Sequence, residues 1–153
     1  MSEQIFLPDR ASRFPPVDFD AFHRQQVQQL IAARHHLVQH DLQGAGSLSL
    51  VTPSGASYTY AFDGFLTITP GAHGATQVLL EEGAFGDFFH ELLSISGLVA
   101  TRRLQVTAGD ITEARRWEPA LRAVYCGRPI YNANTLAEED AARGRAFPLA
   151  RAF

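Results

Sequence analysis

The sequence predicts an α+β protein in which a five-stranded, mainly antiparallel sheet is covered on one face by helices. Three observations predict this fold class. Apolar residues recur at helical spacing before residue 43 and again from Phe85 onward, whereas between Ser47 and Leu80 they alternate with polar ones. A further alternating run at Leu104, Val106 and Ala108 separates two helical segments and supplies the fifth strand.

Composition excludes several classes of protein. The chain has 153 residues, the size of one domain, with 46% hydrophobic and 19% charged residues, so a core can form and wholesale disorder is excluded. A single cysteine, Cys126, excludes an internal disulfide framework and a cysteine-rich zinc cluster. All 13 basic residues are arginine, which excludes Schiff-base catalysis by lysine and the lysine of a phosphate-binding loop.

The distribution of charge predicts neither a nucleic-acid partner nor stable membrane insertion. The net charge is −3, and the arginines are scattered apart from the pairs at 102–103 and 115–116, whereas a nucleic-acid binder normally shows a basic stripe. No apolar stretch approaches the ~20 residues of a membrane span, and the polar N-terminal residues are unlike a secretory signal. We therefore expect a cytoplasmic protein.

The first elements are an irregular arm and a helix. Residues 1–17 hold three prolines and no periodicity, so we expect an arm that precedes a single domain over residues 18–126. Asp18 or Asp20 can cap a helix that runs to about Leu42 before the glycines that follow it. The apolar stripe of this helix consists of Phe22, Val27, Leu30, Ile31, Val38 and Leu42.

Strands follow between Ser47 and Leu80. Turns at 52–55, 63–64 and 70–74 contain glycine and divide this stretch into four short strands. Because each turn is short, we expect an antiparallel meander in which each strand pairs with the next. The apolar positions of the second and third strands are Tyr58, Tyr60, Phe62, Leu66 and Ile68.

The remaining elements are helical, apart from the fifth strand. A helix from residue 85 to 93 and a short apolar segment from 95 to 100 precede this strand. After it, Asp110 and Glu113 resemble a capping box that opens a last helix. Pro119 predicts a break in that helix, because proline lacks the donor that a helix interior needs. The helix ends at Cys126, and residues 127–153 form a C-terminal tail with one or two helical turns around 136–143.

No group of residues argues for catalysis or metal binding. His36 and His40 have the spacing at which two imidazoles of one helix can share a metal ion. A third ligand at a definite separation is missing, however, and the neighbours of these two residues indicate a solvated face. Neither a Gly-x-Ser-x-Gly motif nor a base next to Cys126 is present. We therefore expect a protein that is not an enzyme, with no catalytic residue, no cofactor and no metal.

The helix from residue 85 to 93 carries an unusual number of bulky apolar side chains. Phe85, Phe88 and Phe89 fall within five positions, and Leu92 and Leu93 continue the same stripe. A well-filled core explains this pattern, and so does a ligand cavity, which needs apolar walls with few polar anchors. The residues alone leave both interpretations open.

The stretch from about Ser47 to Val124 resembles the sterol-carrier-protein-like lipid-transfer fold. Three segments carry the resemblance: residues 76–80 running into 83–89, the Leu-Ser-Ile-Ser-Gly sequence at 93–97, and the strand at 104–110 with its terminal Gly-Asp. Arg103 departs from this pattern, because the family usually has glycine before its last strand. The segment from 117 to 131 goes beyond the common pattern, and the C-terminus lacks the peroxisomal signal of eukaryotic members.

The resemblance implies a protein that binds or carries a fatty acyl chain, a sterol or a similar lipid in an apolar cavity. Similar domains occur beside bacterial phytanoyl-CoA dioxygenase-like enzymes, which implies an accessory module with a partner enzyme. We expect the ligand-binding residues to be Tyr60, Phe62, Leu66 and Ile68 of the sheet and Phe85, Phe88, Phe89, Leu92 and Leu93 of the helix, with Leu98 and Val99 at an entrance.

Two alternatives from other functional classes remain. The first is a protein–protein interaction module whose cavity is filled by phenylalanine side chains. The second is a cone-shaped enzyme of the ketosteroid-isomerase type, which is disfavoured because a helical segment of about 15 residues separates the fourth and fifth strands. The sequence leaves open the ligand, the partner enzyme and whether the chain forms a homodimer.

Overall fold

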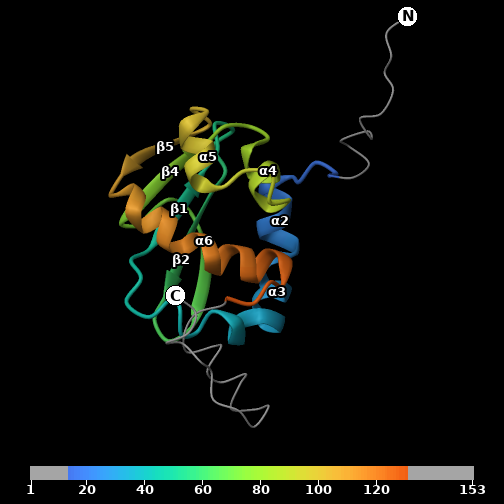
Figure 1. The fold of residues 1–153 in the computed structure, drawn as a ribbon, viewed down its shortest axis with the longest axis vertical. Coiled ribbons are helices and arrows are strands. Elements are labelled where there is room, and N and C mark those ends of the chain that lie inside the picture. The colour runs from blue at the N-terminus through green and yellow to red at the C-terminus, as the bar shows by residue number, and fades with distance from the viewer. Residues whose placement is uncertain (1–13, 131–153) are drawn as a thin grey trace, which may run out of the picture.

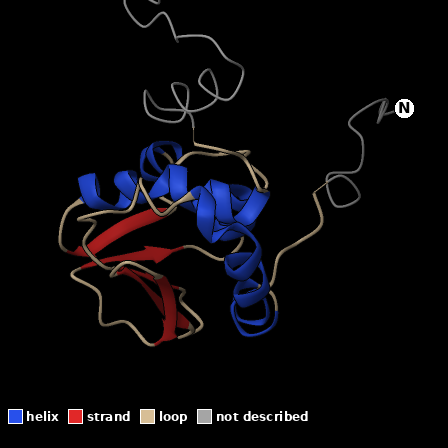
Figure 2. Ribbon diagram, turned by 90° about the horizontal axis from the view of Figure 1, so that it is seen from below, coloured by secondary structure: helices blue, strands red, loops and turns tan. Residues whose placement is uncertain are grey.

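A computed structural model describes residues 14–130 of the chain (Figure 1). The strands form one sheet, and the helices gather on one of its faces (Figure 2). In chain order the elements are α2 (Phe19–Gln25), α3 (Val27–Arg34), the 3₁₀ turn η1 (His35–Leu37), β1 (Leu48–Val51), β2 (Ser57–Phe62), β3 (Leu66–Pro70), β4 (Thr76–Leu80), α4 (Ala84–Phe89), α5 (Ile95–Ala100), β5 (Leu104–Ala108) and α6 (Ile111–Cys126). The predicted fold class is confirmed.

The sheet is mixed, and the predicted meander is wrong at its last step. Its strand order is β3-β2-β1-β4-β5. The pairs β1–β2, β2–β3 and β4–β5 are antiparallel, but β4 lies parallel to β1 instead of pairing with β3. The chain therefore crosses from one edge of the sheet, past β2 and β1, before it enters β4.

Residues Gly71–Ala75 make this crossing on the face of the sheet opposite the helices. Three of their amides donate to side-chain hydroxyls of β1, of β2 or of the residue before β1: His73 to Thr59 at 3.0 Å, Gly74 to Ser49 at 2.8 Å and Ala75 to Ser47 at 2.8 Å. The Ser49 and Thr59 side chains also contact each other, with their oxygens 2.7 Å apart. Both residues are buried, so a polar row that looks solvent-facing in the sequence is instead the support for a crossing segment.

The N-terminal helix is bent into shorter pieces. α2 ends at Gln25, α3 begins at Val27, and η1 with further turns replaces the predicted last part of the helix up to about Leu42. Asp18 is the cap, because its carboxylate accepts the amide of Ala21 at 2.8 Å. The predicted apolar stripe nevertheless faces the core: Phe22, Val27, Ile31, Val38 and Leu42 are buried, and Leu30 packs against them.

α4 ends at Phe89, four residues earlier than the spacing predicts. In a continued helix the Phe88 carbonyl would bond to the amide of Leu92. That carbonyl instead accepts the amide of Glu91 and the guanidinium of Arg122, each at 3.0 Å, while the amide of Leu92 donates to the Asp87 carbonyl. Glu91 adopts a left-handed conformation with φ of 60°, which stops the helix. A tertiary contact therefore overrides the apolar pattern.

The break predicted at Pro119 does not occur, because α6 continues through it to Cys126. Pro119 and Arg115, whose carbonyl loses its helical donor, are both exposed, so water can satisfy that carbonyl. Asp110 caps the helix by accepting the amide of Thr112 at 2.9 Å. Glu113 does not complete the capping box, since its carboxylate accepts the amide of Gly46 instead.

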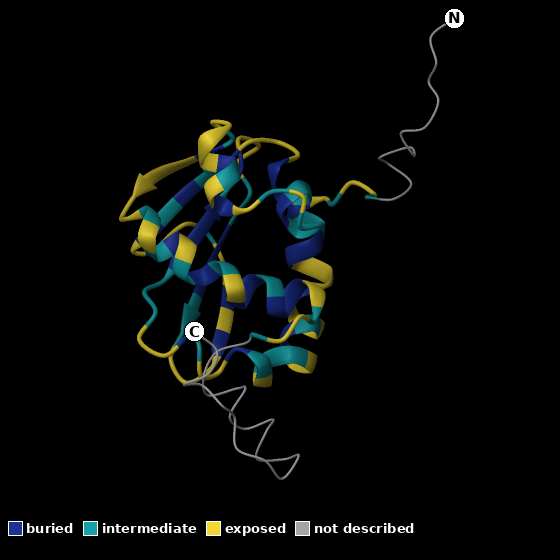
Figure 3. Cartoon of the chain, in the orientation of Figure 1, coloured by how far each residue is buried: buried dark blue, intermediate teal, exposed yellow. Residues whose placement is uncertain are grey.

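The core lies between the sheet and the helices, as the dark residues in Figure 3 show. Trp117 of α6 is fully buried, and its indole N–H donates to the Gly46 carbonyl at 2.7 Å.

Residues 14–18 and 127–130 lie outside helices and strands. The remainder of the predicted arm and tail, including the helical turns expected around 136–143, falls outside the described residues.

Replacing Gly74 by alanine should destabilise the protein by about 1–3 kcal/mol, because overpacking forces the backbone to shift. A Cβ at Gly74 would lie 2.7 Å from the Ser49 hydroxyl and 2.9 Å from the Ser49 amide nitrogen. Gly86 in α4 is the matched control. A Cβ there meets nothing closer than 3.7 Å, so Gly86→Ala should stabilise by about 0.5–1 kcal/mol. Denaturant unfolding measures both changes, and equal effects at the two sites would contradict the crossing geometry.

Candidate functional site

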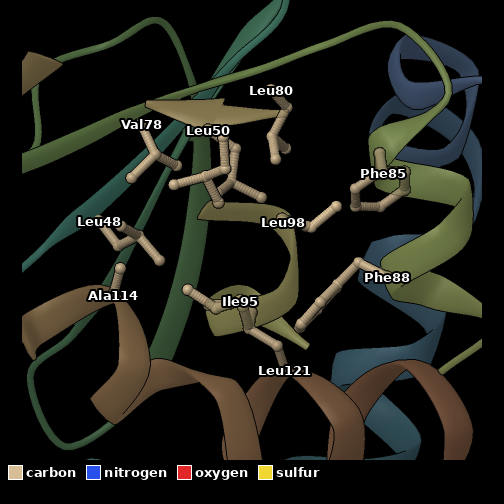
Figure 4. Close-up of a pocket in the computed structure, with 11 residues that line it drawn as sticks. Leu48, Leu50, Val78, Leu80, Phe85, Phe88, Ile95, Leu98, Ala114 and Leu121 are labelled. Atoms are coloured by element: carbon tan, nitrogen blue, oxygen red, sulfur yellow. The ribbon is translucent and has the colours of Figure 1, made fainter. Parts of the chain in front are cut away.

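An apolar pocket lies between the sheet and the three helices α4, α5 and α6 (Figure 4). β1 and β4 form its floor because their parallel pairing places alternate side chains of two central strands side by side. α4 and α5 form one wall and α6 another. The lining side chains, all apolar, are Leu48, Leu50, Val78, Leu80, Phe85, Phe88, Ile95, Leu98, Leu104, Ala114 and Leu121.

The pocket is almost closed in this conformation. The open volume inside it is about 20 Å³, which is room for one water-sized molecule. An acyl chain or a sterol needs a cavity on the order of 300 Å³ or more. The side chains or the helices that line the pocket must therefore move before it can accept such a ligand.

The structure places only part of the predicted residues at this pocket. Phe85, Phe88 and Leu98 line it. Tyr60, Leu66 and Ile68 are buried in the core away from it, and Phe62, Phe89 and Leu93 pack at the margin of the core. Leu92 and Val99 are 39% and 36% exposed.

Two features of the fold explain why the other predicted residues lie away from this pocket. The early end of α4 turns Leu92 out to solvent, since the helical spacing no longer applies beyond Phe89. The β2 and β3 side of the sheet is covered by α2 and α3, and Tyr60 packs there against His23. Leu48 and Leu50, which alternate with serines in the sequence, were not predicted as site residues. This alternation indicates the floor of the pocket only when β1 is known to be the central strand of the sheet.

Beside the pocket lies a cluster of aromatic rings from α2, α4 and α6. The ring of Phe85 is 5.1 Å from that of Phe19, 5.5 Å from Phe22 and 5.6 Å from Tyr125, measured between centroids. Phe88 also contacts Tyr125, at 6.2 Å. Such edge and tilted contacts stabilise beyond the area they bury. Phe85 and Phe88 therefore separate the pocket from a filled aromatic region.

A buried chain of hydrogen bonds runs through this aromatic region. His23 Nδ1 lies 2.7 Å from the Phe19 carbonyl, His23 Nε2 lies 2.6 Å from the Tyr60 hydroxyl, and that hydroxyl lies 2.6 Å from the Tyr125 hydroxyl. The carbonyl can only accept, so Nδ1 carries the proton and donates. In the neutral ring Nε2 then accepts from Tyr60, and Tyr60 accepts from Tyr125. The chain has one consistent direction when His23 is uncharged.

Burial keeps these groups neutral. It lowers the pKa of His23 to about 4, because the charged imidazolium loses its hydration. Burial likewise raises the pKa of Tyr60 and of Tyr125 well above the ordinary value for a phenol. At the edge of the cluster, burial together with a hydrogen bond to Asp20 raises the pKa of Tyr58 to about 12.

Arg122 of α6 fixes the loop that joins α4 to α5. Its guanidinium donates to the carbonyls of Phe88 at 3.0 Å and Leu93 at 3.1 Å and lies 4.5 Å above the Phe88 ring. Glu118, one turn earlier on α6, accepts the amide of Ile95 at 2.6 Å. The hydrogen bonds of Arg122 and Glu118 hold the two short helices of the pocket wall against α6, and we call them the α6 clamp.

The candidate metal ligands of the sequence do not assemble. His36 and His40 are both solvent-accessible. Within residues 14–130, no three side chains of His, Cys, Asp or Glu come together at a distance that would hold a metal ion.

None of the helices in that part of the chain has the length and apolar character needed to cross a bilayer.

Comparison with known proteins identifies the fold. No protein-family model and no curated protein sequence matches the chain. A conserved hypothetical protein from Thermus thermophilus, described as possibly a sterol carrier protein, has a similar structure with a TM-score of 0.52 and 14% identity, over 71% of this chain and 90% of that one. Sterol carrier protein 2 from Yarrowia lipolytica, in its apo form, gives 0.50 and 12%, over 72% and 98%. The protein has the sterol-carrier-protein-like fold.

The sterol-carrier-protein-like fold also occurs inside a larger chain. The sec-alkylsulfatase Pisa1 from Pseudomonas sp. is similar over 76% of this chain but only 17% of its own length, with a TM-score of 0.50 and 15% identity. At such identities the likeness concerns the fold alone. The family resemblance predicted from the strand and helix segments is confirmed at that level.

Acidification should destabilise the protein through His23. Its pKa falls from 6.5 to about 4 on folding, so between these values the unfolded chain binds a proton that the folded chain does not. Stability is therefore fully present above pH 6.5 and declines toward pH 4, by roughly 2–3 kcal/mol from this group.

The control for this prediction is His23→Gln, whose amide can still accept from Tyr60 but does not titrate. Unfolding free energies measured at intervals from pH 7.5 to pH 4 should fall less steeply for this variant than for the wild type. Parallel curves for the two proteins would contradict the assignment of His23 as a buried neutral group.

Proposed function

We propose that the protein binds the hydrocarbon part of a fatty acyl chain, a sterol or a similar lipid in the apolar pocket, without catalysing a reaction. The observation that carries the proposal is the wholly apolar lining at the junction of β1, β4 and three helices. Each methylene moved from water into such surroundings contributes about 0.8 kcal/mol. The sterol-carrier-protein-like fold supports the same function.

The pocket wall that can move is the α4–α5 segment. Each of these helices has six residues, and so short a helix depends on tertiary contacts for its stability. The α6 clamp supplies several of these contacts through Arg122 and Glu118. Displacing the segment outward enlarges the pocket while the sheet and α6 stay in place.

The lining predicts how a ligand is oriented. With no polar side chain in the pocket, a carboxylate or phosphate inside it would lose its hydration without gaining a hydrogen-bond donor. The hydrocarbon end therefore enters and the polar end stays in solvent. A role as the accessory module of a partner enzyme is compatible with this orientation, because the polar end remains accessible.

Titration with a fluorescent fatty acid tests the function. We expect saturable binding whose free energy improves with chain length by about 0.8 kcal/mol per methylene until the pocket is full. Ala114→Leu should weaken binding at least fivefold, because Ala114 is a buried lining residue and a larger side chain occupies the ligand's space. Phe65→Ala, which changes a side chain that is 62% exposed, is the control and should leave binding unchanged.

The same experiment separates the carrier from the interaction module with a filled core. In a closed core, Phe88→Ala costs the full ~3–5 kcal/mol of unfolding free energy, and no fatty acid binds to either form. A carrier loses less on that substitution, and its fatty-acid affinity changes by a larger factor than its stability. Absence of saturable binding together with full destabilisation would reject the carrier.

Removing the α6 clamp should loosen the pocket wall. Arg122→Met keeps the apolar stem but loses the hydrogen bonds to Phe88 and Leu93, so amide hydrogen exchange over residues 84–100 should become at least threefold faster. Fatty-acid association should accelerate with it. Arg24→Met, which removes an exposed ion pair with Asp20, is the control. Unchanged exchange over 84–100 in Arg122→Met would contradict the role of the clamp.

A further inference from the structure

Residues 92–101, which contain α5, form an uncharged part of the pocket wall. None of the ten residues of this segment carries a charged side chain. Ile95 and Leu98 are buried, and both line the pocket. Of the others, Leu93 and Gly97 are half-buried and the rest are exposed. Figure 4 shows Ile95 and Leu98 in the space between the strands and α4. The segment therefore contributes two side chains to the pocket and faces solvent on its other side.

The segment is bounded by two turns in a conformation that strains any residue except glycine. Within residues 14–130, Glu91 and Arg102 are the only non-glycine residues with a positive φ, of 60° and 61°. Each follows the C-cap of a short helix, α4 or α5, a position where glycine is the usual residue. A Cβ makes the left-handed conformation unfavourable. Unwinding either turn therefore relieves strain.

The chain just outside the two turns is anchored. The Arg103 guanidinium, at the start of β5, donates to the Asp87 carboxylate of α4 at 2.6 Å. This contact joins the two ends of the segment at its base. α4 is also packed into the aromatic cluster, and His90 after it donates from Nε2 to the Pro15 carbonyl at 2.8 Å. α4 is thus fixed on several sides.

The segment itself is held by few polar contacts. Arg122 donates to the Leu93 carbonyl at 3.1 Å, and Glu118 accepts the Ile95 amide at 2.6 Å. Both contacts belong to the α6 clamp and lie toward the N-terminal end of the segment. Among the described residues, no side chain from outside the segment forms a hydrogen bond with residues 96–101. Burial of Ile95 and Leu98 is therefore the main contact that keeps α5 in place.

We propose that residues 92–101 form a lid, the α5 lid, which swings outward about Glu91 and Arg102 and admits the ligand while α4 stays in place. In the closed lid, Ile95 and Leu98 occupy space that a hydrocarbon chain would take, which accounts for the small open volume. Lifting the lid withdraws both side chains and relieves the strain of both turns. The entering hydrocarbon then replaces the lost apolar contacts. This inference rests on the proposed function and narrows the moving wall to α5.

Two substitutions of Arg102 test the hinge. Arg102→Val and Arg102→Asn both remove the exposed guanidinium, but asparagine tolerates the left-handed conformation and β-branched valine does not. Without ligand, amide hydrogen exchange over residues 94–101 should be at least threefold faster in the valine variant, because a lifted helix of six residues loses its support. Exchange over residues 84–89 should be equal in the two variants. Equal exchange of the lid, or the same increase over residues 84–89, would overturn the proposal.

Thiol labelling tests the movement without changing either hinge. In a Cys126→Ser background, Leu98→Cys places a thiol on the inner side of the lid, and Val124→Cys places one on α6 outside the pocket. Both positions are buried, so labelling requires the structure to open. We expect modification at position 98 to be at least tenfold faster, because position 124 becomes accessible only in larger unfolding events. Similar rates at the two positions would contradict a lid.

Stopped-flow association of a fluorescent fatty acid connects the lid to ligand entry. The association rate should be higher in Arg102→Val than in Arg102→Asn by about the same factor as exchange over residues 94–101. A rate that does not follow exchange would overturn the lid as the entrance. Exchange and labelling use ligand-free protein, so a failure of the lid is detected there. A failure of the proposed function is detected instead as absence of saturable binding to the wild type.

Discussion

The structure depends on the hydrogen bonds that hold residues 71–75 against the hydroxyls of Ser49 and Thr59. These bonds carry the chain across β2 and β1, so β4 joins the sheet beside β1 and parallel to it. Two strands with apolar inner residues thereby become central neighbours. An antiparallel meander would have placed β4 at the edge beyond β3, and the present pocket floor would not exist. A polar contact on the outer face thus determines an apolar site on the inner face.

The crossing also divides the sheet into two halves of different character. Beneath α2 and α3, β2 and β3 support rings and the chain of hydrogen bonds from His23 through Tyr60 to Tyr125, in which each of these three side chains has a partner. Beneath α4, α5 and α6, β1 and β4 contribute to a pocket whose lining side chains are all apolar. In the first half the buried polar groups must stay paired, which restricts how its side chains can rearrange. The second half has no such constraint, since apolar contacts impose no direction, and the proposed function requires it to open.

Much of the fold follows from local patterns, and much of the site does not. Alternation located all five strands, and helical spacing identified Phe85 and Phe88, which do line the pocket. The errors share a cause, which is that contacts distant in the sequence override a local rule. Arg122 takes the Phe88 carbonyl and ends α4, so Leu92 turns outward, and solvent exposure lets α6 continue through Pro119. Strand order was the feature that the sequence predicted least well. A serine or threonine gives the same sequence pattern whether its hydroxyl faces water or another segment of the chain.

Isoleucine-methyl NMR tests the central claim, that the β1–β4 half of the sheet is the part that takes an apolar ligand. Ile95 lines the pocket, whereas Ile68 is buried in the other half, so the two methyl groups report separately on the two regions of one protein. On titration with a saturated fatty acid, the account predicts saturable shifts and direct acyl-chain contacts for Ile95, while Ile68 stays unchanged. Contacts at Ile68 instead, or shifts at neither residue with the fatty acid in excess, would contradict it.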